Sequence, residues 1–307
     1  MITTERFKQK KLLILTGPTC SGKTENSIKV AKEFNLDIIA ADSMQIYKKF
    51  NIGTGKPSPH QRELVRHHLI DLIDPNDFFN AWNYMNLSRD LISKLDNIPL
   101  IAGGTQLYIS SMLNGLSDGV GANKEVRDQI LMEINQKGSQ HVYEQLKKID
   151  IETADKIKPN DKSRITRAME IYYTRKQKPS DYLKQNPAKP LANVKIKKVG
   201  IKFDKDELDL YIKNRALRMI DDGLIGETDS IISEYGLELK PLKSIGYKEI
   251  VSYLEKKMTL DDAIKKIIVN TRRLAKRQVT WLRKDSKMEW HDNSDSLMKS
   301  IREFLIN

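Results

Sequence analysis

The feature that most constrains this chain is a glycine-bounded loop, GPTCSGKT, at residues 17–24. It follows a short apolar run, Leu12–Leu15, and precedes a stretch with helical spacing, Glu25–Phe34. The loop matches the pattern G-x-x-x-x-G-K-[S/T] in the strand–loop–helix setting that the motif requires. In such loops backbone N–H groups hold phosphate oxygens, the lysine adds a positive charge, and the last hydroxyl can bind Mg²⁺. The sequence therefore predicts a diphosphate or triphosphate site formed by Gly17, Pro18, Thr19, Cys20, Ser21, Gly22, Lys23 and Thr24, with Thr24 as a candidate Mg²⁺ ligand.

Apolar strands and helices alternate along the first third of the chain. Such alternation is typical of a parallel α/β sheet, in which ligands bind at the carboxyl ends of the strands. The predicted fold is a phosphate-loop NTPase-like parallel sheet flanked by helices. Its expected strands are Lys11–Thr16, Leu36–Ala41, Leu69–Leu72 and Ile98–Ala102, and its expected helices are Glu25–Phe34 and Ala81–Leu95.

The character of the sequence changes after a glycine-rich passage, Gly115–Gly121. The segment Lys124–Arg175 is highly charged and helical in its spacing, and Lys176–Pro190 contains three prolines, which predict a loop. A strand is then expected at Val194–Phe203. Amphipathic helices are expected at Leu208–Tyr235 and Thr259–Lys284. We predict an α/β core over residues 1–116, an all-helical insertion over 117–192, and the second part of the core, with basic C-terminal helices, over 193–307.

The chain is strongly basic, with 53 Lys and Arg against 41 Asp and Glu and a formal net charge of +12. This excess favours a polyanionic partner such as a nucleic acid, because neutralised phosphates release counterions; a merely soluble basic surface is the alternative. The single cysteine, Cys20, cannot form an internal disulfide and suits a reducing compartment. No apolar run approaches the roughly 20 residues of a membrane span, so we expect a cytoplasmic protein without a membrane partner.

Polar side chains follow two of the predicted strands. Asp42-Ser43-Met44-Gln45 comes directly after one of them, where Asp42 could serve as a base or metal ligand, or simply cap a helix. Gly103-Gly104-Thr105 follows another; the glycines allow close approach of a ligand and Thr105 offers a hydroxyl, although a tight turn would also explain the glycines. Two adjacent histidines, His67 and His68, would point to opposite faces of a strand, which favours structural hydrogen bonds over a shared metal.

A basic amphipathic helix is predicted near the end of the chain, at Thr271–Lys284. One face holds Leu274, Gln278, Trp281 and Leu282, and another holds Arg273, Lys276, Arg277, Thr280, Arg283 and Lys284. A row of cations beside an aromatic ring suits contact with a phosphate backbone. The alternative is a solvated surface face. A second basic helix, Lys162–Lys178, carries Arg164, Arg167 and Arg175.

Taken in order, these motifs resemble the bacterial tRNA dimethylallyltransferases, also called isopentenyltransferases. The resemblance covers nearly the whole length of the chain, and it is the ordered set of motifs, more than the phosphate loop alone, that makes it specific. Besides that loop it rests on Asp42-Ser43-x-Gln45-Ile46-Tyr47, Gly53-Thr54-x-Lys56-Pro57, His68-Leu69-Ile70-Asp71, Gly103-Gly104-Thr105-x-Leu107-Tyr108, Arg164-x-x-Arg167-Ala168-x-Glu170, Gly246-Tyr247 and Lys276-Arg277-Gln278-x-Thr280-Trp281-Leu282.

The resemblance implies that dimethylallyl diphosphate donates its five-carbon group to N6 of the adenosine just 3′ of the anticodon in tRNA, with Mg²⁺ required and pyrophosphate released. It implies Asp42 as general base, Thr105 at the reacting centre and Arg215 as a stabiliser of the leaving group. It also implies a helical insertion that grasps the anticodon stem-loop, and we expect a monomer. The implied RNA contacts are Asp42, Ser43, Met44, Gln45, Thr105, Arg127, Ser163, Arg164, Ile165, Thr166, Arg167, Lys243, Gly246, Tyr247, Lys248, Lys276, Arg277, Gln278, Thr280, Trp281 and Arg283.

Two other functions share some of these features. A small-molecule or nucleoside kinase would need the phosphate loop but not the basic helix Thr271–Lys284. A non-catalytic RNA-binding module, or an RNA-binding ATPase, would need a carboxylate at the end of an apolar strand, for which Asp71 is the nearest candidate.

Overall fold

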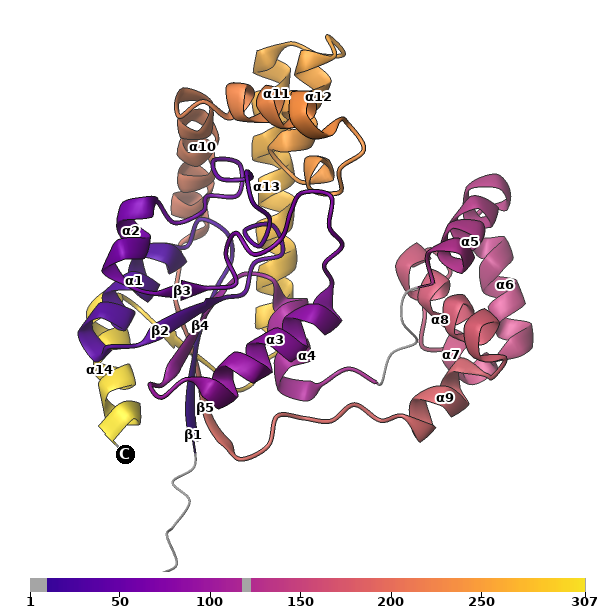
Figure 1. Cartoon of the computed structure of the whole chain (residues 1–307), viewed down its shortest axis with the longest axis horizontal. Coiled ribbons are helices and arrows are strands. Elements are labelled where there is room, and N and C mark those ends of the chain that lie inside the picture. Colours follow the sequence, from indigo (N-terminus) through magenta and orange to yellow (C-terminus); the bar gives the residue numbers. More distant parts are fainter. Residues whose placement is uncertain (1–9, 118–122, 307) are drawn as a thin grey trace, which may run out of the picture. The chain divides into compact units, whose positions relative to one another are not determined.

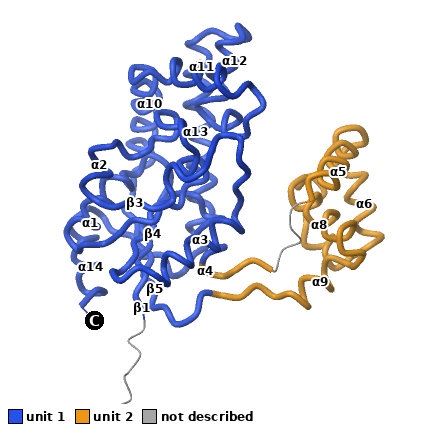
Figure 2. The backbone as a smooth tube through the Cα atoms, viewed as in Figure 1, with its two compact units in different colours: residues 1–112, 191–307 blue, residues 113–190 orange. Residues whose placement is uncertain are grey.

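The computed structural model describes residues 10–117 and 123–306. The chain divides into two compact units, one formed by residues 1–112 and 191–307 and the other by residues 113–190 (Figure 2). The second unit occupies nearly the same residues as the predicted helical insertion, 117–192. Most of the glycine-rich passage, residues 118–121, lies outside the described residues.

The first unit is built on a parallel sheet with the strand order β3-β2-β4-β1-β5-β6 within the described residues (Figure 1). Each neighbouring pair of strands is parallel. Non-consecutive neighbours require crossover connections, which helices supply in α/β proteins. The strands are β1 (Lys10–Thr16), β2 (Asp37–Ala40), β3 (His67–His68), β4 (Pro99–Gly103), β5 (Val194–Ile201) and β6 (Met288–His291).

Both faces of this sheet are covered, as the uninterrupted apolar run in β1 requires. On one face Leu13 and Leu15 pack with Ile28 of α1 (Lys23–Phe34) and Leu297 of α14 (Ser294–Ile306). Alternate residues, such as Leu12 and Ile14, point to the opposite face. In Figure 1 the helices α3 (Ala81–Lys94) and α4 (Gln106–Asn114) lie on that side of the sheet. A short helix, α2 (Pro59–Leu64), precedes β3.

The chain between β5 and β6 forms a group of helices that pack on one another. Helix α10 packs on α13, and α12 packs on both α11 and α13. These helices are α10 (Lys205–Asp221), α11 (Leu224–Tyr235), the 3-10 turn η1 (Pro241–Lys243), α12 (Tyr247–Leu254) and α13 (Leu260–Leu282). The longest of them, α13, carries the predicted basic face. None of the described helices is both long and apolar enough to cross a membrane.

The second unit is entirely helical in its described residues. Its core is apolar and includes Ile130, Leu146, Ile165 and Met169, all at most 3% exposed. Its helices are α5 (Lys124–Lys137), α6 (Ser139–Ile149), α7 (Ile151–Ala154), α8 (Lys162–Arg175) and α9 (Pro179–Gln185).

The structure corrects several predicted elements. The strand expected at Leu69–Leu72 is wrong: Leu69 and Asp71 have positive φ angles of 61° and 52°, and the short strand is the preceding β3. The loop expected at Lys176–Pro190 contains α9, because Pro179 occupies the start of a helix, where proline is well tolerated. The helix expected at Leu208–Tyr235 is two helices, which Gly223, with φ of 100°, separates. Neither β6 nor α14 was predicted.

Candidate active site

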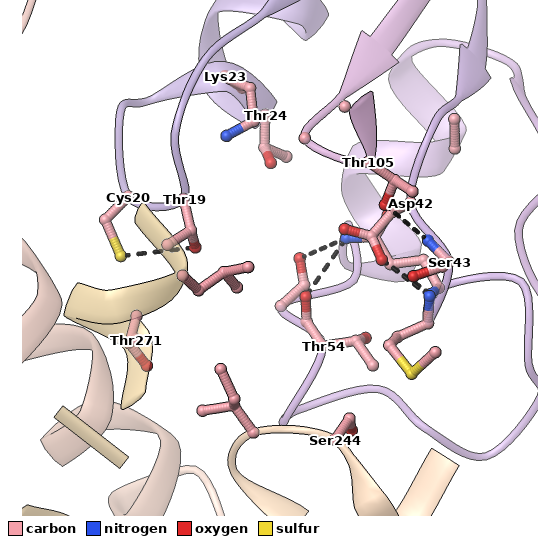
Figure 3. A pocket seen from close by; sticks show the side chains of 18 of the residues that line it. Thr19, Cys20, Lys23, Thr24, Asp42, Ser43, Thr54, Thr105, Ser244 and Thr271 are labelled. Atoms are coloured by element: carbon pink, nitrogen blue, oxygen red, sulfur yellow. Dashed lines mark hydrogen bonds between the residues drawn. The ribbon is translucent and has the colours of Figure 1, made fainter. Parts of the chain in front are cut away.

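A cavity of about 920 Å³ lies at the carboxyl ends of the parallel strands in the first unit. Its walls are the phosphate loop, the segments after β2 and β4, the loop 53–57, helix α10, the segment 243–248 and helix α13. In Figure 3 Thr19, Lys23 and Thr24 approach from one side, and Asp42 and Thr105 from the other. The sheet therefore brings together the predicted phosphate loop and the candidate groups Asp42 and Thr105, which are far apart in the sequence.

The phosphate loop is closed around the Pro18 carbonyl. That oxygen accepts hydrogen bonds from the Lys23 ammonium at 2.5 Å and the Ser21 hydroxyl at 2.8 Å. Helix α1 begins at Lys23, and among the described residues no side chain caps its first turn. The N–H groups at such a helix start, together with the helix dipole, form an anion site. Thr19, Cys20, Gly22, Lys23 and Thr24 line the cavity, whereas Gly17, Pro18 and Ser21 shape the loop behind it.

The ammonium of Lys23 is only weakly held in its charged form. Burial, and secondarily the positive charge of Arg215, lowers the pKa of Lys23 to about 8. A diphosphate bound at the loop would supply negative charge, which raises this pKa again and favours the charged form. The loop thus gains an electrostatic partner when it gains a ligand.

Asp42 and Thr105 come from the ends of the neighbouring strands β2 and β4. The Asp42 Oδ1 atom accepts from the Met44 N–H at 2.9 Å and from the Gln45 N–H at 3.4 Å. These bonds cap a turn rather than a helix, and they use only one carboxylate oxygen. The Thr105 hydroxyl oxygen accepts from the Ser43 N–H at 3.1 Å, so its own proton can be donated elsewhere. The two side chains are therefore held by the same turn.

Close backbone packing fixes this pair of strand ends. The Thr105 N–H donates to the Ala41 carbonyl at 3.0 Å. A Cβ atom on Gly103 would lie 2.3 Å from that same carbonyl oxygen. Only glycine fits at Gly103. The glycine is needed for the tight connection after β4, and it also lines the cavity.

Arg215 reaches the cavity from helix α10. Its guanidinium donates to the Thr19 hydroxyl at 3.2 Å and to the Thr54 carbonyl at 3.3 Å. Gly55, at φ of 60°, allows this approach, because a Cβ atom there would lie 2.6 Å from the guanidinium Nη2. Arg215 therefore bridges the phosphate loop and the loop 53–57.

Glu227, a residue that no sequence motif marks, anchors the residues that lead into the loop 53–57. Its carboxylate accepts from the backbone N–H groups of Asn51 and Ile52 at 3.0–3.1 Å and from the Tyr247 hydroxyl at 2.6 Å. The Tyr247 hydroxyl in turn accepts from the Gly53 N–H at 3.1 Å. The backbone partners of Glu227 lie about 175 residues away in the sequence, so no local pattern on the amphipathic helix α11 marks this acidic residue.

All the RNA-contact residues implied by the resemblance except Tyr247 fall into three groups. The first lines the cavity and comprises Asp42, Ser43, Met44, Gln45, Thr105, Lys243, Gly246, Lys248, Arg277, Gln278 and Trp281. The second lies exposed on α13 and comprises Lys276, Thr280 and Arg283. The third, in the helical unit, comprises Arg127, Ser163, Arg164, Ile165, Thr166 and Arg167.

Three of these side chains are not available at the surface. Ile165 and Thr166 are at most 2% exposed, with side chains in the interior of the helical unit, and their implied contact with RNA stays a prediction. Tyr247 is fully buried against Phe50, with ring centroids 4.8 Å apart. Arg167 pairs at 3.0 Å with the fully buried Glu170, which also accepts from the Asn123 N–H. The motifs that carry the resemblance therefore contain both exposed residues, which remain candidates for RNA contact, and buried residues beside them.

Several other candidates have structural partners. The ring of His68 hydrogen-bonds the Asp37 carboxylate at 2.7 Å, and His67 bonds the Val65 carbonyl at 2.8 Å. The carboxylate of Asp71 is paired with Lys56 at 2.5 Å and Arg62 at 2.6 Å, which argues against a metal-binding role of the ATPase type. Among the residues that the structure describes, no group of three or more His, Cys, Asp or Glu side chains is placed to hold a metal.

Comparison with known proteins identifies the family. Residues 45–285 match the model of a family described as IPP transferase, and residues 10–76 match one described as isopentenyl transferase. The chain is 40% identical over 295 residues, covering 93% of both chains, to a tRNA dimethylallyltransferase of Thermodesulfovibrio yellowstonii. It is 38% identical to that of Carboxydothermus hydrogenoformans, covering 97% of this chain and 96% of the relative.

Solved structures agree. A tRNA isopentenylpyrophosphate transferase from Bacillus halodurans has a TM-score of 0.70 and 31% identity, covering 97% of this chain and 96% of the other. A eukaryotic dimethylallyltransferase whose structure is described as acting on tRNA has a TM-score of 0.75 and 27% identity, covering 89% of this chain and 70% of the other. With a phosphate loop, two polar strand ends and relatives matched over nearly their full length, this chain belongs to the tRNA dimethylallyltransferase family of prenyl-transferring enzymes.

Proposed function

We propose that this enzyme transfers the dimethylallyl group of dimethylallyl diphosphate to N6 of the adenosine just 3′ of the anticodon in tRNA, releasing pyrophosphate. One observation carries the proposal: the uncapped phosphate loop and the pair Asp42 and Thr105 line the same cavity. The names of the relatives support a tRNA acceptor and a dimethylallyl donor.

Asp42 is proposed as the general base. The exocyclic amine of adenine is a weak nucleophile, because its lone pair is delocalised into the ring. As the new N–C bond forms, a carboxylate must accept the amine proton. The Met44 and Gln45 N–H groups hold one oxygen of Asp42, which orients the other for this task.

The leaving group is stabilised from the opposite wall. When the allylic C–O bond breaks, its electron pair passes to the diphosphate, and negative charge develops there. Lys23, the N–H groups at the start of α1 and the guanidinium of Arg215 are proposed to neutralise that charge. Thr105, whose oxygen already accepts from Ser43, has a free O–H proton with which to orient the reacting groups.

The residues present also fit Mg²⁺. This ion keeps several waters and binds through one or two protein groups together with substrate phosphates, so it does not need a cluster of carboxylates. The hydroxyl of Thr24, exposed at the cavity wall, is the proposed protein ligand. When bound, the ion would offset part of the diphosphate charge.

The RNA contacts are proposed to divide between the two units. Lys243, Lys248 and Arg277 border the cavity, where the extruded base must enter. Lys276, Thr280 and Arg283 extend the contact along α13, and Arg127, Ser163, Arg164 and Arg167 of the helical unit would hold the anticodon stem-loop. We also propose that the enzyme acts as a monomer, in the cytoplasm where tRNA is processed.

A transfer assay tests the proposal directly. The protein is incubated with Mg²⁺, labelled dimethylallyl diphosphate and an unmodified tRNA that has adenosines at the last anticodon position and the next one. Label is expected in the RNA, at the adenosine just 3′ of the anticodon. A tRNA with guanosine at that single position is the matched control and should stay unlabelled. Absence of label from the adenosine-containing tRNA would exclude the proposed function, and phosphoryl transfer from ATP would favour a kinase.

A further inference from the structure

The side chain of Gln278 does not face outward with the basic row of α13 but spans two parts of the cavity wall. Its Oε1 atom accepts from the Thr19 N–H at 2.8 Å, and its Nε2 atom donates to the Gly104 carbonyl at 2.9 Å. The first contact is on the phosphate loop and the second is at the end of β4. Both hydrogen-bonding ends of the glutamine amide are therefore used within the protein.

The chemistry of these partners requires an amide. A backbone N–H can only donate and a carbonyl can only accept, so the bridging side chain must offer an acceptor to Thr19 and a donor to Gly104. Glutamate lacks the donor, methionine offers only a weakly accepting sulfur, and asparagine is one carbon shorter. Gln278 satisfies both partners in a single orientation of its amide.

The wall opposite Gln278 is shaped to admit it. A Cβ atom on Gly104 would lie 2.6 Å from the Gln278 Nε2 atom, whereas its next neighbours, including the Gly17 carbonyl oxygen, would be at an ordinary 3.6 Å. Gly104 has no positive φ angle that would itself require glycine. The bare backbone at Gly104 is thus explained by the approach of Gln278.

Thr19 is held from two directions. Its backbone N–H is bound by Gln278, and its hydroxyl is bound by Arg215 at 3.2 Å. Because this N–H points to the glutamine, the N–H groups left for a ligand are those further along the loop and at the start of α1. The position of Gln278 thereby determines which N–H groups of the phosphate loop are left to bind a ligand.

We propose that Gln278 is a positioning residue for the diphosphate, a role that rests on the proposed function. Its side chain holds the phosphate loop against the end of β4, beside Thr105. This role differs from the direct RNA contact that the resemblance implies. The same helix carries the exposed Lys276 and Arg283, so one element would serve both substrates through different side chains. Loss of these two hydrogen bonds should weaken diphosphate binding and leave RNA binding unchanged.

The test compares two substitutions on one helix. Gln278→Met keeps the length of the side chain and removes both hydrogen bonds, and Lys276→Gln removes an exposed charge two residues away. Binding of Mg²⁺-pyrophosphate is measured by calorimetry and binding of an anticodon stem-loop RNA by fluorescence anisotropy, with a thermal melt to confirm folding. Gln278→Met should lower pyrophosphate affinity by up to about a hundredfold without changing RNA affinity, since each of the two intraprotein bonds can bias the loop geometry by at most about tenfold. Lys276→Gln should lower RNA affinity without changing pyrophosphate affinity.

A second variant keeps the test independent of any one substitution. Gly104→Ala places a methyl group against the Gln278 amide and should reproduce the loss of pyrophosphate affinity. In the Gln278→Ala background the same methyl group has room, so the double variant should bind pyrophosphate no more weakly than Gln278→Ala alone. Additive losses, or a loss of RNA affinity in Gln278→Met with pyrophosphate affinity intact, would overturn the proposal. Neither assay requires prenyl transfer, so failure of the proposed function would be seen separately.

Discussion

At the scale of single residues, the two oxygens of the Asp42 carboxylate differ in what they bind. Asp42 uses one oxygen to fix the turn that holds Ser43 and Met44, and the other oxygen takes no part in those bonds. The Ser43 N–H in turn fixes Thr105. A single aspartate therefore both orders the strand end and serves the proposed chemistry.

Asp42→Asn separates these tasks. The asparagine keeps an oxygen for the Met44 N–H but cannot accept the amine proton at neutral pH. Turnover should fall by about 10²–10⁴-fold, the usual contribution of a general base. Single-turnover transfer measures the loss, and RNA binding should stay at the wild-type level. Turnover equal to that of the wild type would remove Asp42 from the mechanism.

The lowered pKa of Lys23 predicts a pH dependence of diphosphate binding. Below a pH of about 8 the ammonium is already charged, and above it binding must take up a proton. Affinity for Mg²⁺-pyrophosphate should therefore be highest below pH 8 and fall by up to about tenfold per pH unit above it. Calorimetry over a range of about 1.5 pH units on either side of the Lys23 pKa of about 8 measures this dependence. The Lys23→Met variant should bind Mg²⁺-pyrophosphate more weakly, and its affinity should not show this decrease above pH 8. A decrease that persists in the variant would arise from titration of the pyrophosphate itself.

At the scale of elements, the loop 51–55 depends on two helices distant in the sequence. Glu227 of α11 binds its N–H groups, and Tyr247 at the start of α12 binds both Glu227 and Gly53. This anchoring holds the Thr54 carbonyl where Arg215 can donate to it. The Gly246-Tyr247 motif is thereby explained as an anchor for the loop.

Tyr247→Phe tests that interpretation. The variant loses a buried hydroxyl with two partners, so the free energy of unfolding should fall by about 1–2 kcal/mol. Chemical denaturation measures the change, and Tyr211→Phe, at a tyrosine that is 57% exposed, is the matched control with no expected effect. RNA affinity should be unchanged. A loss of RNA affinity without a loss of stability would instead support direct contact by Tyr247.

Much of the element order could be predicted because its signals are local. The apolar runs of β1, β2 and β4 and the alternating pattern of β5 are local signals, and the predicted bounds of these strands agree within two residues. The strand β6 was missed because four residues at the sheet edge, two of them only half-buried, carry no clear pattern. The contacts of Gln278 and Glu227 depend on segments that only the fold brings together.

At the scale of the whole molecule, the chain is basic, and part of its positive charge lies exposed on the helix proposed to contact RNA. The chain carries a net charge of +12, and α13 places Arg273, Lys276 and Arg283 in exposed positions. Such an interface binds largely by counterion release. Its affinity should therefore depend steeply on salt.

A salt titration quantifies that dependence. The logarithm of the affinity for the anticodon stem-loop should fall linearly with the logarithm of the salt concentration. Lys276→Gln should reduce the slope by roughly 0.7, the value for one phosphate contact on a single strand. Fluorescence anisotropy at several salt concentrations gives both slopes. Identical slopes would place Lys276 outside the RNA contact.

The carbonyl of Pro18 has a consequence for the end of the catalytic cycle. It offers the Lys23 ammonium a 2.5 Å partner inside the loop itself. In the proposed reaction, a departing pyrophosphate would not leave a bare cation behind, because the lysine can return to this oxygen. Stabilising the empty loop in this way would lower the affinity for every diphosphate, product included, and would favour product release over product inhibition.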